Sequence, residues 1–170
     1  DPDRNSVEGA MSALSGCGID NIEIALTAQE LPGLDGSSRC YIELLDRAGI
    51  VTQDAADRCF SIPHPIYCQE GKGLIVAVPA PDFRISYTLQ FDYPYIPMQH
   101  VDQIITPDYF RNSLAYARTF CIEEEVKDLM QEGLGRGASY ENTLVIGADG
   151  NVIKNTLRAS DELARHKVLD

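Results

Sequence analysis

Hydrophobic residues in the first fifty positions repeat with two different spacings. Residues 6–17 and 41–48 each carry apolar side chains on one helical face, and glycines follow both segments, so we expect two helices there. Residues 21–26 alternate apolar and polar side chains, which predicts a half-buried strand. Residues 31–37 contain a proline, two glycines and an aspartate, a composition typical of a turn.

The pattern becomes strand-like after residue 58. Apolar residues recur in 62–66, 74–78 and 85–91. The sequence Glu-Gly-Lys-Gly at 70–73 is typical of a hairpin turn between two such strands. We therefore expect at least one antiparallel hairpin in this region.

Helical spacing returns further along the chain. Residues 107–115 and 123–132 each predict a helix, and a glycine is placed to end the second. Residues 143–146 and 152–153 are short apolar runs on either side of 149–150, an Asp-Gly pair that favours a hairpin turn. Strands followed by helices, with few parallel crossovers, predict an α+β fold in which helices cover one face of each sheet.

The change of pattern near the middle predicts a domain boundary at 50–58. Residues 1–50 would form the C-terminal half of a first α+β domain, 51–58 a linker, and 59–170 a second α+β domain truncated at its C-terminus. The last helical pattern stops at Asp170 with apolar residues that still need partners. We therefore expect the chain to be a fragment of a longer protein.

Composition narrows the class of function. The net charge is −12 and the 14 Lys and Arg residues are scattered, which argues against nucleic-acid binding. No run reaches the roughly 18 apolar residues of a membrane helix, and the N-terminus lacks a signal-peptide pattern, so we expect a cytoplasmic, monomeric protein. Five cysteines without Cys-x-x-Cys spacing predict reduced thiols and neither disulfides nor a thiolate zinc site.

The C-terminal segment carries the clearest chemical signal. Ser160 suits a helix N-cap, and His166 and Asp170, four residues apart, would lie on one helical face where a single cation could touch both. Such pairs in soluble helices are also commonly solvated or hydrogen-bonded to each other. The spacing alone leaves both interpretations open.

Eight short motifs span nearly the whole chain: SVE at 6–8, MSAL at 11–14, GIDN at 18–21, LDGS at 34–37, ARTF at 117–120, GLG at 133–135, SYEN at 139–142 and RHKVLD at 165–170. In this order they resemble the end of the first domain and the second domain of the UDP-3-O-acyl-N-acetylglucosamine deacetylases, zinc hydrolases of lipid A biosynthesis. The resemblance implies two small sheet-plus-helix units layered as a β-α-α-β sandwich, the first incomplete, with the active site between them. It also implies Zn2+ as cofactor and a UDP-linked acylated glucosamine as substrate, which would lose its N-acetyl group.

The resemblance also implies roles for single residues. His166 and Asp170 match zinc ligands, Glu8 matches the general base, Thr119 matches a hydroxyl that steadies the oxyanion, and Lys167 matches a neighbouring cation. Amide hydrolysis at zinc uses this set: protein ligands with an open position for water, a carboxylate to deprotonate it, and donors for the oxyanion. Taken singly, each of these residues is also compatible with an ordinary structural or solvated role.

Further residues match the part of the family that contacts substrate. The expected substrate-binding residues are Lys72, Phe120, Ser139 and Tyr140. The apolar residues Phe120, Ile122, Val126 and 144–146 lie where the family builds its acyl-chain tunnel. Apolar residues at such positions are also commonly part of the core, and a lysine in a turn is commonly solvated.

The sequence departs from the family at a decisive position. Gly9 stands where the family motif Val-Glu-His-Leu has a zinc-binding histidine, and Tyr93 replaces a histidine that is not a ligand. His64, between prolines, and His100, in a polar stretch expected to be a loop, are poor substitutes. Three hypotheses follow: a zinc deacetylase that is inactive or impaired as given, a non-catalytic relative that has lost the metal and binds only the sugar nucleotide or acyl chain, and a truncated product that does not fold stably alone.

Overall fold

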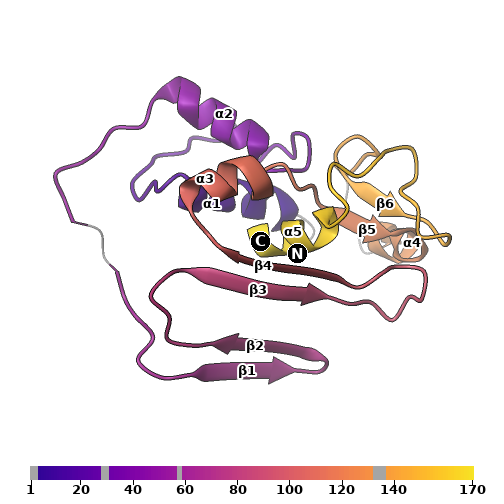
Figure 1. Ribbon diagram of the computed structural model, residues 1–170. Helices are drawn as coiled ribbons and strands as arrows, with labels where there is room; N and C mark the ends of the chain where they lie inside the picture. Colours follow the sequence, from indigo (N-terminus) through magenta and orange to yellow (C-terminus); the bar gives the residue numbers. More distant parts are fainter. Residues whose placement is uncertain (1–3, 28–30, 57–58, 132–136) are drawn as a thin grey trace.

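The computed structural model describes residues 4–27, 31–56, 59–131 and 137–170 (Figure 1). Its N-terminal part contains the two helices that the helical spacing predicts, α1 (Arg4–Gly16) and α2 (Arg39–Ala48), packed against each other. Gly49 ends α2 with a φ of 84° and donates its N–H to the Leu45 carbonyl at 3.0 Å. A glycine is suited to this position because it lacks the Cβ that disfavours positive φ.

The strand predicted at 21–26 is wrong. These residues form no ladder with any segment that the structure describes, and their three large apolar side chains are each 48% exposed. Alternation alone does not make a strand, because sheet stability comes from pairing with a neighbour. The turn predicted at 31–37 is present, with positive φ at Leu34 (49°) and Gly36 (78°).

Two antiparallel hairpins follow. The first joins β1 (Ile66–Glu70) to β2 (Gly73–Ala77) through the predicted turn, where Gly71 has a φ of 55°. The second pairs β3 (Arg84–Leu89) with β4 (Gln99–Ile104). In Figure 1 the first hairpin lies at the outer edge of the molecule, and its side chains are almost all exposed.

The loop expected around His100 is therefore wrong. His100 lies within β4, opposite Thr88, and its Nδ1 is 2.9 Å from the Thr88 hydroxyl oxygen across the ladder. The histidine side chain is exposed, so it can lie on the outer face of the hairpin while the alternate residue Val101 packs inward.

The helix expected at 107–115 is present, with a change of geometry. It begins as α3 (Pro107–Tyr109), where the Thr106 hydroxyl caps the helix by accepting the Tyr109 N–H at 3.0 Å. It then widens into a π-helical segment, η1 (Phe110–Leu114), whose first and last residues are buried.

The next elements form a parallel crossover. Strand β5 (Phe120–Ile122) leads into helix α4 (Glu123–Gln131), and the chain returns as β6 (Leu144–Ile146), parallel to β5. The helix predicted at 123–132 is confirmed up to Gln131, and its expected end at Gly133 lies outside the described residues. The predicted Asp-Gly turn after β6 is present, and one antiparallel bridge joins Ile146 to Val152.

The last helix, α5 (Glu162–Leu169), lies near the centre of the fold and packs on β3, β4, η1 and α1 (Figure 1). Most of its side chains are buried, including Leu163, Ala164, His166 and Leu169. The mixture of helices and small sheets confirms the α+β class. The division into units 1–50 and 59–170 stays a prediction. Among the described helices, none has both the length and the apolar character needed to cross a membrane.

Candidate active site

His166 is one of the buried polar residues in the described part of the chain. The residue is only 1% exposed, and its Nδ1 lies 3.1 Å from the Ala117 carbonyl oxygen. A carbonyl only accepts, so Nδ1 carries the proton and Nε2 holds a bare lone pair. Within the described part of the chain, Nε2 is buried and has no hydrogen-bond partner.

Asp170 places a carboxylate next to this lone pair. Its Oδ1 lies 3.3 Å from His166 Nε2, close enough for an ion pair with a protonated ring but not aligned as a hydrogen bond. Burial lowers the pKa of His166, while Asp170 and the bond to Ala117 oppose that effect only in part. A lowered pKa keeps the imidazole neutral at pH 7, the form in which histidine binds metals.

Lys167 and Phe120 complete the surroundings of this pair. Lys167 Nζ lies 2.6 Å from Asp170 Oδ2 and 5.5 Å from the centre of the Phe120 ring. The same ring meets the His166 imidazole edge-on, with 6.3 Å between ring centres. Four of the residues singled out from the sequence therefore lie together, from α5 and β5.

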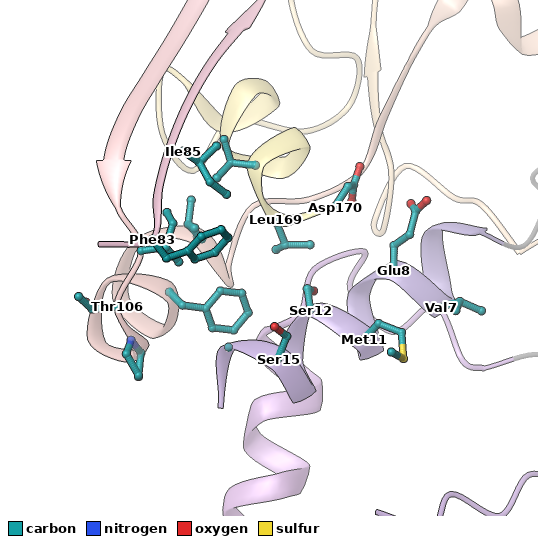
Figure 2. A pocket seen from close by; sticks show the side chains of 16 residues that line it. Val7, Glu8, Met11, Ser12, Ser15, Phe83, Ile85, Thr106, Leu169 and Asp170 are labelled. Carbon is teal, nitrogen blue, oxygen red and sulfur yellow. The ribbon is translucent and has the colours of Figure 1, made fainter. Parts of the chain in front are cut away.

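A cavity of about 530 Å³ opens between α1, α5 and the β3–β4 hairpin. Glu8, from α1, and Asp170, from the end of α5, both line this cavity. Figure 2 shows their two carboxylates on the same side of the cavity. The rest of the wall is mostly apolar, with Val7, Met11, Phe83, Ile85, Phe110 and Leu169 among its residues. The fold thus brings the acid near the start of the chain to the metal-ligand candidates at its end.

Thr119 is buried beside this group and is fixed through its backbone. Its N–H donates to the Gly36 carbonyl at 2.9 Å, and its carbonyl accepts from the Leu144 N–H at 2.9 Å. The residue follows Ala117 and Arg118 and precedes Phe120. It therefore lies on the chain segment that supplies the carbonyl contact to His166.

The other expected substrate-binding residues lie elsewhere. Lys72, in the exposed β1–β2 turn, pairs with Asp92. Ser139 and Tyr140 lie in the loop before β6, where Lys154 Nζ is 4.5 Å from the centre of the Tyr140 ring. None of the three lines the cavity beside Glu8. Their role in substrate binding stays a prediction.

The apolar residues assigned to an acyl tunnel are mostly core residues. Ile122, Leu144 and Ile146 are almost fully buried in the hydrophobic core, where they join β5 and β6 to the rest of the fold. Close packing explains this outcome, because a short buried parallel pair requires apolar residues on both faces. Phe120 and Val126 are the exceptions, since both are only partly buried, and Phe120 contacts His166.

The donors present fit zinc at two positions. A neutral imidazole nitrogen and a carboxylate oxygen are ordinary zinc ligands, and an orphaned buried Nε2 is the expected state of a ligand histidine. A zinc site needs a third protein ligand, and the described residues contain no group of three His, Cys, Asp or Glu side chains placed for one. Gly9 offers no donor. A Cβ built there would meet only ordinary contacts, the nearest being Ser37 O and Tyr41 Cε2 at 3.8 Å.

Sequence reasoning missed Arg118 and Glu162. Their side chains form an ion pair of 2.8 Å inside the protein, with exposures of 4% and 0%. Two sequence features could have pointed to this pair: Glu162 lies one helical turn before His166, and Arg118 follows Ala117. Nothing in the sequence spacing shows that the segment around residue 118 meets the start of α5.

Comparisons with known proteins identify the family of this chain. Over residues 4–170 the chain matches a family of deacetylases that act on a UDP-linked sugar. It belongs to the LpxC family, the UDP-3-O-acyl N-acetylglycosamine deacetylases.

Individual relatives carry the same name. The chain is 37% identical over 166 residues to the UDP-3-O-acyl-N-acetylglucosamine deacetylase of Syntrophotalea carbinolica, covering 98% of this chain and 54% of that protein. It is 39% identical over 165 residues to that of Thermosynechococcus vestitus, covering 97% and 57%, and 39% over 166 residues to that of Chlamydia caviae, covering 97% and 59%. The chain thus spans little more than half the length of these curated relatives.

Proposed function

We propose that this chain carries the His166, Asp170 and Glu8 part of the active site of a zinc-dependent UDP-3-O-acyl-N-acetylglucosamine deacetylase. One observation carries the proposal: the buried Nε2 of His166, which has no hydrogen-bond partner among the described residues, faces a carboxylate that lines the same cavity as Glu8. A buried polar atom without a partner is costly, and a bound cation would remove that cost. Membership of the family supplies the substrate class.

The reaction would be hydrolysis of the N-acetyl amide. His166 Nε2 and Asp170 would hold Zn2+, which when bound supplies Lewis-acid polarisation and lowers the pKa of water. Glu8 would accept a proton as water adds to the acetyl carbon, and would return it to the departing amine as the C–N bond breaks. The products are acetate and the free amine.

Two further residues would assist the developing negative charge. Lys167, now paired with Asp170, places a cation beside the metal-ligand candidates. The hydroxyl of Thr119, on the segment next to His166, would donate to the oxyanion of the tetrahedral intermediate. Phe120, packed against the imidazole and beneath Lys167, would keep water from reaching the His166 ring freely.

Gly9 favours a second candidate function. A site with two protein ligands in place of three binds zinc weakly, because even indirect changes around a metal site cost about 10- to 100-fold in affinity or activity. The protein would then be a non-catalytic relative that retains the cavity and binds the sugar nucleotide or the acyl chain.

Zinc content and acetate release distinguish the two candidates. For a deacetylase, dialysed protein retains zinc and releases acetate from UDP-3-O-acyl-N-acetylglucosamine, Glu8→Gln loses the activity but keeps the metal, and His166→Ala loses both. Glu23→Gln, which alters an exposed carboxylate, is the matched control and changes neither. A protein that binds the substrate without retaining zinc or releasing acetate supports the non-catalytic role and refutes the hydrolase.

A further inference from the structure

The peptide group between Ala117 and Arg118 is held at both ends by helix α5. Its carbonyl oxygen accepts from His166 Nδ1 at 3.1 Å, and its N–H donates to Glu162 Oε1 at 3.1 Å. Glu162 and His166 are four residues apart and so lie on one face of the helix. Because a peptide group is planar, fixing the direction of its N–H also fixes the direction of its carbonyl. Glu162 therefore controls the acceptor that orients the His166 ring.

The Glu162 carboxylate is itself held rigidly. Arg118 grips it with two side-chain bonds, from Nε to Oε1 at 2.8 Å and from Nη2 to Oε2 at 3.1 Å, and the Arg158 N–H donates to Oε2 as well. Paired contacts of this kind fix angle as well as distance.

Arg118 is anchored on its other side. Its Nη1 donates to Asn155 Oδ1 at 3.0 Å, and its Nη2 donates to the Thr156 carbonyl at 2.7 Å. The guanidinium thus ties the segment before β5, the loop 155–156 and the start of α5 into one polar network. The Glu162 carboxylate, which accepts the Arg118 N–H, therefore has little freedom to rotate.

Stability alone gives little reason for this pair. A buried ion pair costs so much desolvation that apolar residues of similar volume are often equally stable or better. The position of the pair gives a clearer reason. The pair holds the peptide group whose carbonyl accepts from His166 Nδ1, and this hydrogen bond leaves Nε2 unprotonated and directed at Asp170.

We propose that Glu162 and Arg118 are positioning residues for His166, holding its ring in the Nδ1-protonated tautomer with Nε2 free for a ligand. The inference that this orientation serves a metal rests on the proposed function. The tautomer itself does not, because it follows from the contacts of a single peptide group.

Nitrogen-15 NMR of the histidine rings tests the tautomer directly. The chain has three histidines, so the His166 signals are assigned by comparison with His64→Gln and His100→Gln. In the unaltered protein His166 should show a protonated Nδ1 and an unprotonated Nε2. In Glu162→Gln the two ring nitrogens should exchange between tautomers, and zinc affinity, measured by chelator competition, should fall about 10- to 100-fold.

The matched control is Asp161→Asn, which breaks an ion pair of 2.7 Å with Arg165 on the same helix but touches neither Ala117 nor His166. It should leave the ring signals and the zinc affinity unchanged. Should Glu162→Gln fail to fold, the double variant Arg118→Met with Glu162→Leu removes the pair without leaving a buried charge. It should fold and still lose the single tautomer.

The results separate the two proposals. A folded Glu162 variant that keeps a single Nδ1-protonated ring and zinc affinity within twofold overturns the positioning role. An unaltered protein that binds no zinc overturns the proposed metal site, and the tautomer comparison then decides the positioning role by itself.

Discussion

Replacing Gly9 by histidine is the sharpest test of the proposed site. Gly9 lies inside α1, next to Glu8, and has no strained φ. A Cβ at this position would meet Ser37 O and Tyr41 Cε2 at 3.8 Å and Ser38 Oγ at 3.9 Å, all ordinary van der Waals distances. The helix can therefore accept a Cβ atom here without moving its backbone.

The expected size of the effect follows from two separate contributions. Removing a glycine from a helix interior stabilises the fold by about 0.5–1 kcal/mol when alanine replaces it, and by somewhat less for histidine. A third ligand should matter more. Because indirect changes near a metal already cost up to about 100-fold, supplying the absent ligand should tighten zinc binding at least that much, or by about 2.7 kcal/mol.

Zinc affinity of Gly9→His, measured by competition with a chelator, should be compared with that of Gly9→Ala. Alanine provides the same gain in helix propensity without an imidazole, so it isolates the ligand from the backbone effect. Adding His166→Ala to Gly9→His should remove the gain. Equal zinc affinity in Gly9→His and Gly9→Ala would show that position 9 does not face the metal pair, and the reasoning about the absent ligand would fail.

Two further variants test how the fold holds the site. Gly36→Ala should destabilise the protein by more than about 2 kcal/mol in chemical denaturation, because φ is 78° and the new Cβ would lie 1.7 Å from Asn142 O. Gly18→Ala is the comparison: its φ is 66° but no atom lies near the new Cβ, so it should lose only the stability that positive φ costs a residue with a Cβ. Burial raises the pKa of Asp35, but hydrogen bonds from Ser37 and Arg158 outweigh it and lower the pKa. The Asp35 contribution should therefore be present above about pH 4 and fade as acid protonates the folded carboxyl, so the stability difference between the unaltered protein and Arg158→Met should shrink in acid; a constant difference would contradict this.

The sequence predicted elements whose signals are local. The periodicity and glycine endings of 6–17 and 41–48, and the Glu-Gly-Lys-Gly turn at 70–73, all match the structure because one segment contains the whole cause. The pairing of His166 with Asp170 belongs to the same class, since an i, i+4 step fixes it within a single helix.

Strand β4 escaped prediction for a physical reason. Its inward-facing first residue, Gln99, is polar, which breaks the apolar alternation. The Gln99 side chain forms two hydrogen bonds near the start of α5. Its Oε1 accepts the Ala164 N–H at 2.9 Å, and its Nε2 donates to the Ser160 carbonyl at 3.2 Å. A buried polar side chain of this kind is stable only with partners supplied from far along the chain.

The parallel pairing of β5 with β6 and the ion pair between Arg118 and Glu162 were not predictable for the same reason. Each joins residues more than twenty positions apart, and neither segment alone carries a pattern that names its partner. The sequence singled out residues of the candidate site, while the contacts that orient them depend on tertiary packing.

Thr119 continues the ladder of β5 in both directions, toward β6 through Leu144 and toward the N-terminal turn through Gly36. The turn at 31–37 therefore acts as an edge partner of the segment that holds the His166 ring. We expect an insertion in that turn to disturb the hydrogen bond between Gly36 and Thr119, two residues from Ala117. Residues 51–56, the described part of the predicted linker at 51–58, are all exposed, so we expect the chain to tolerate changes in length there.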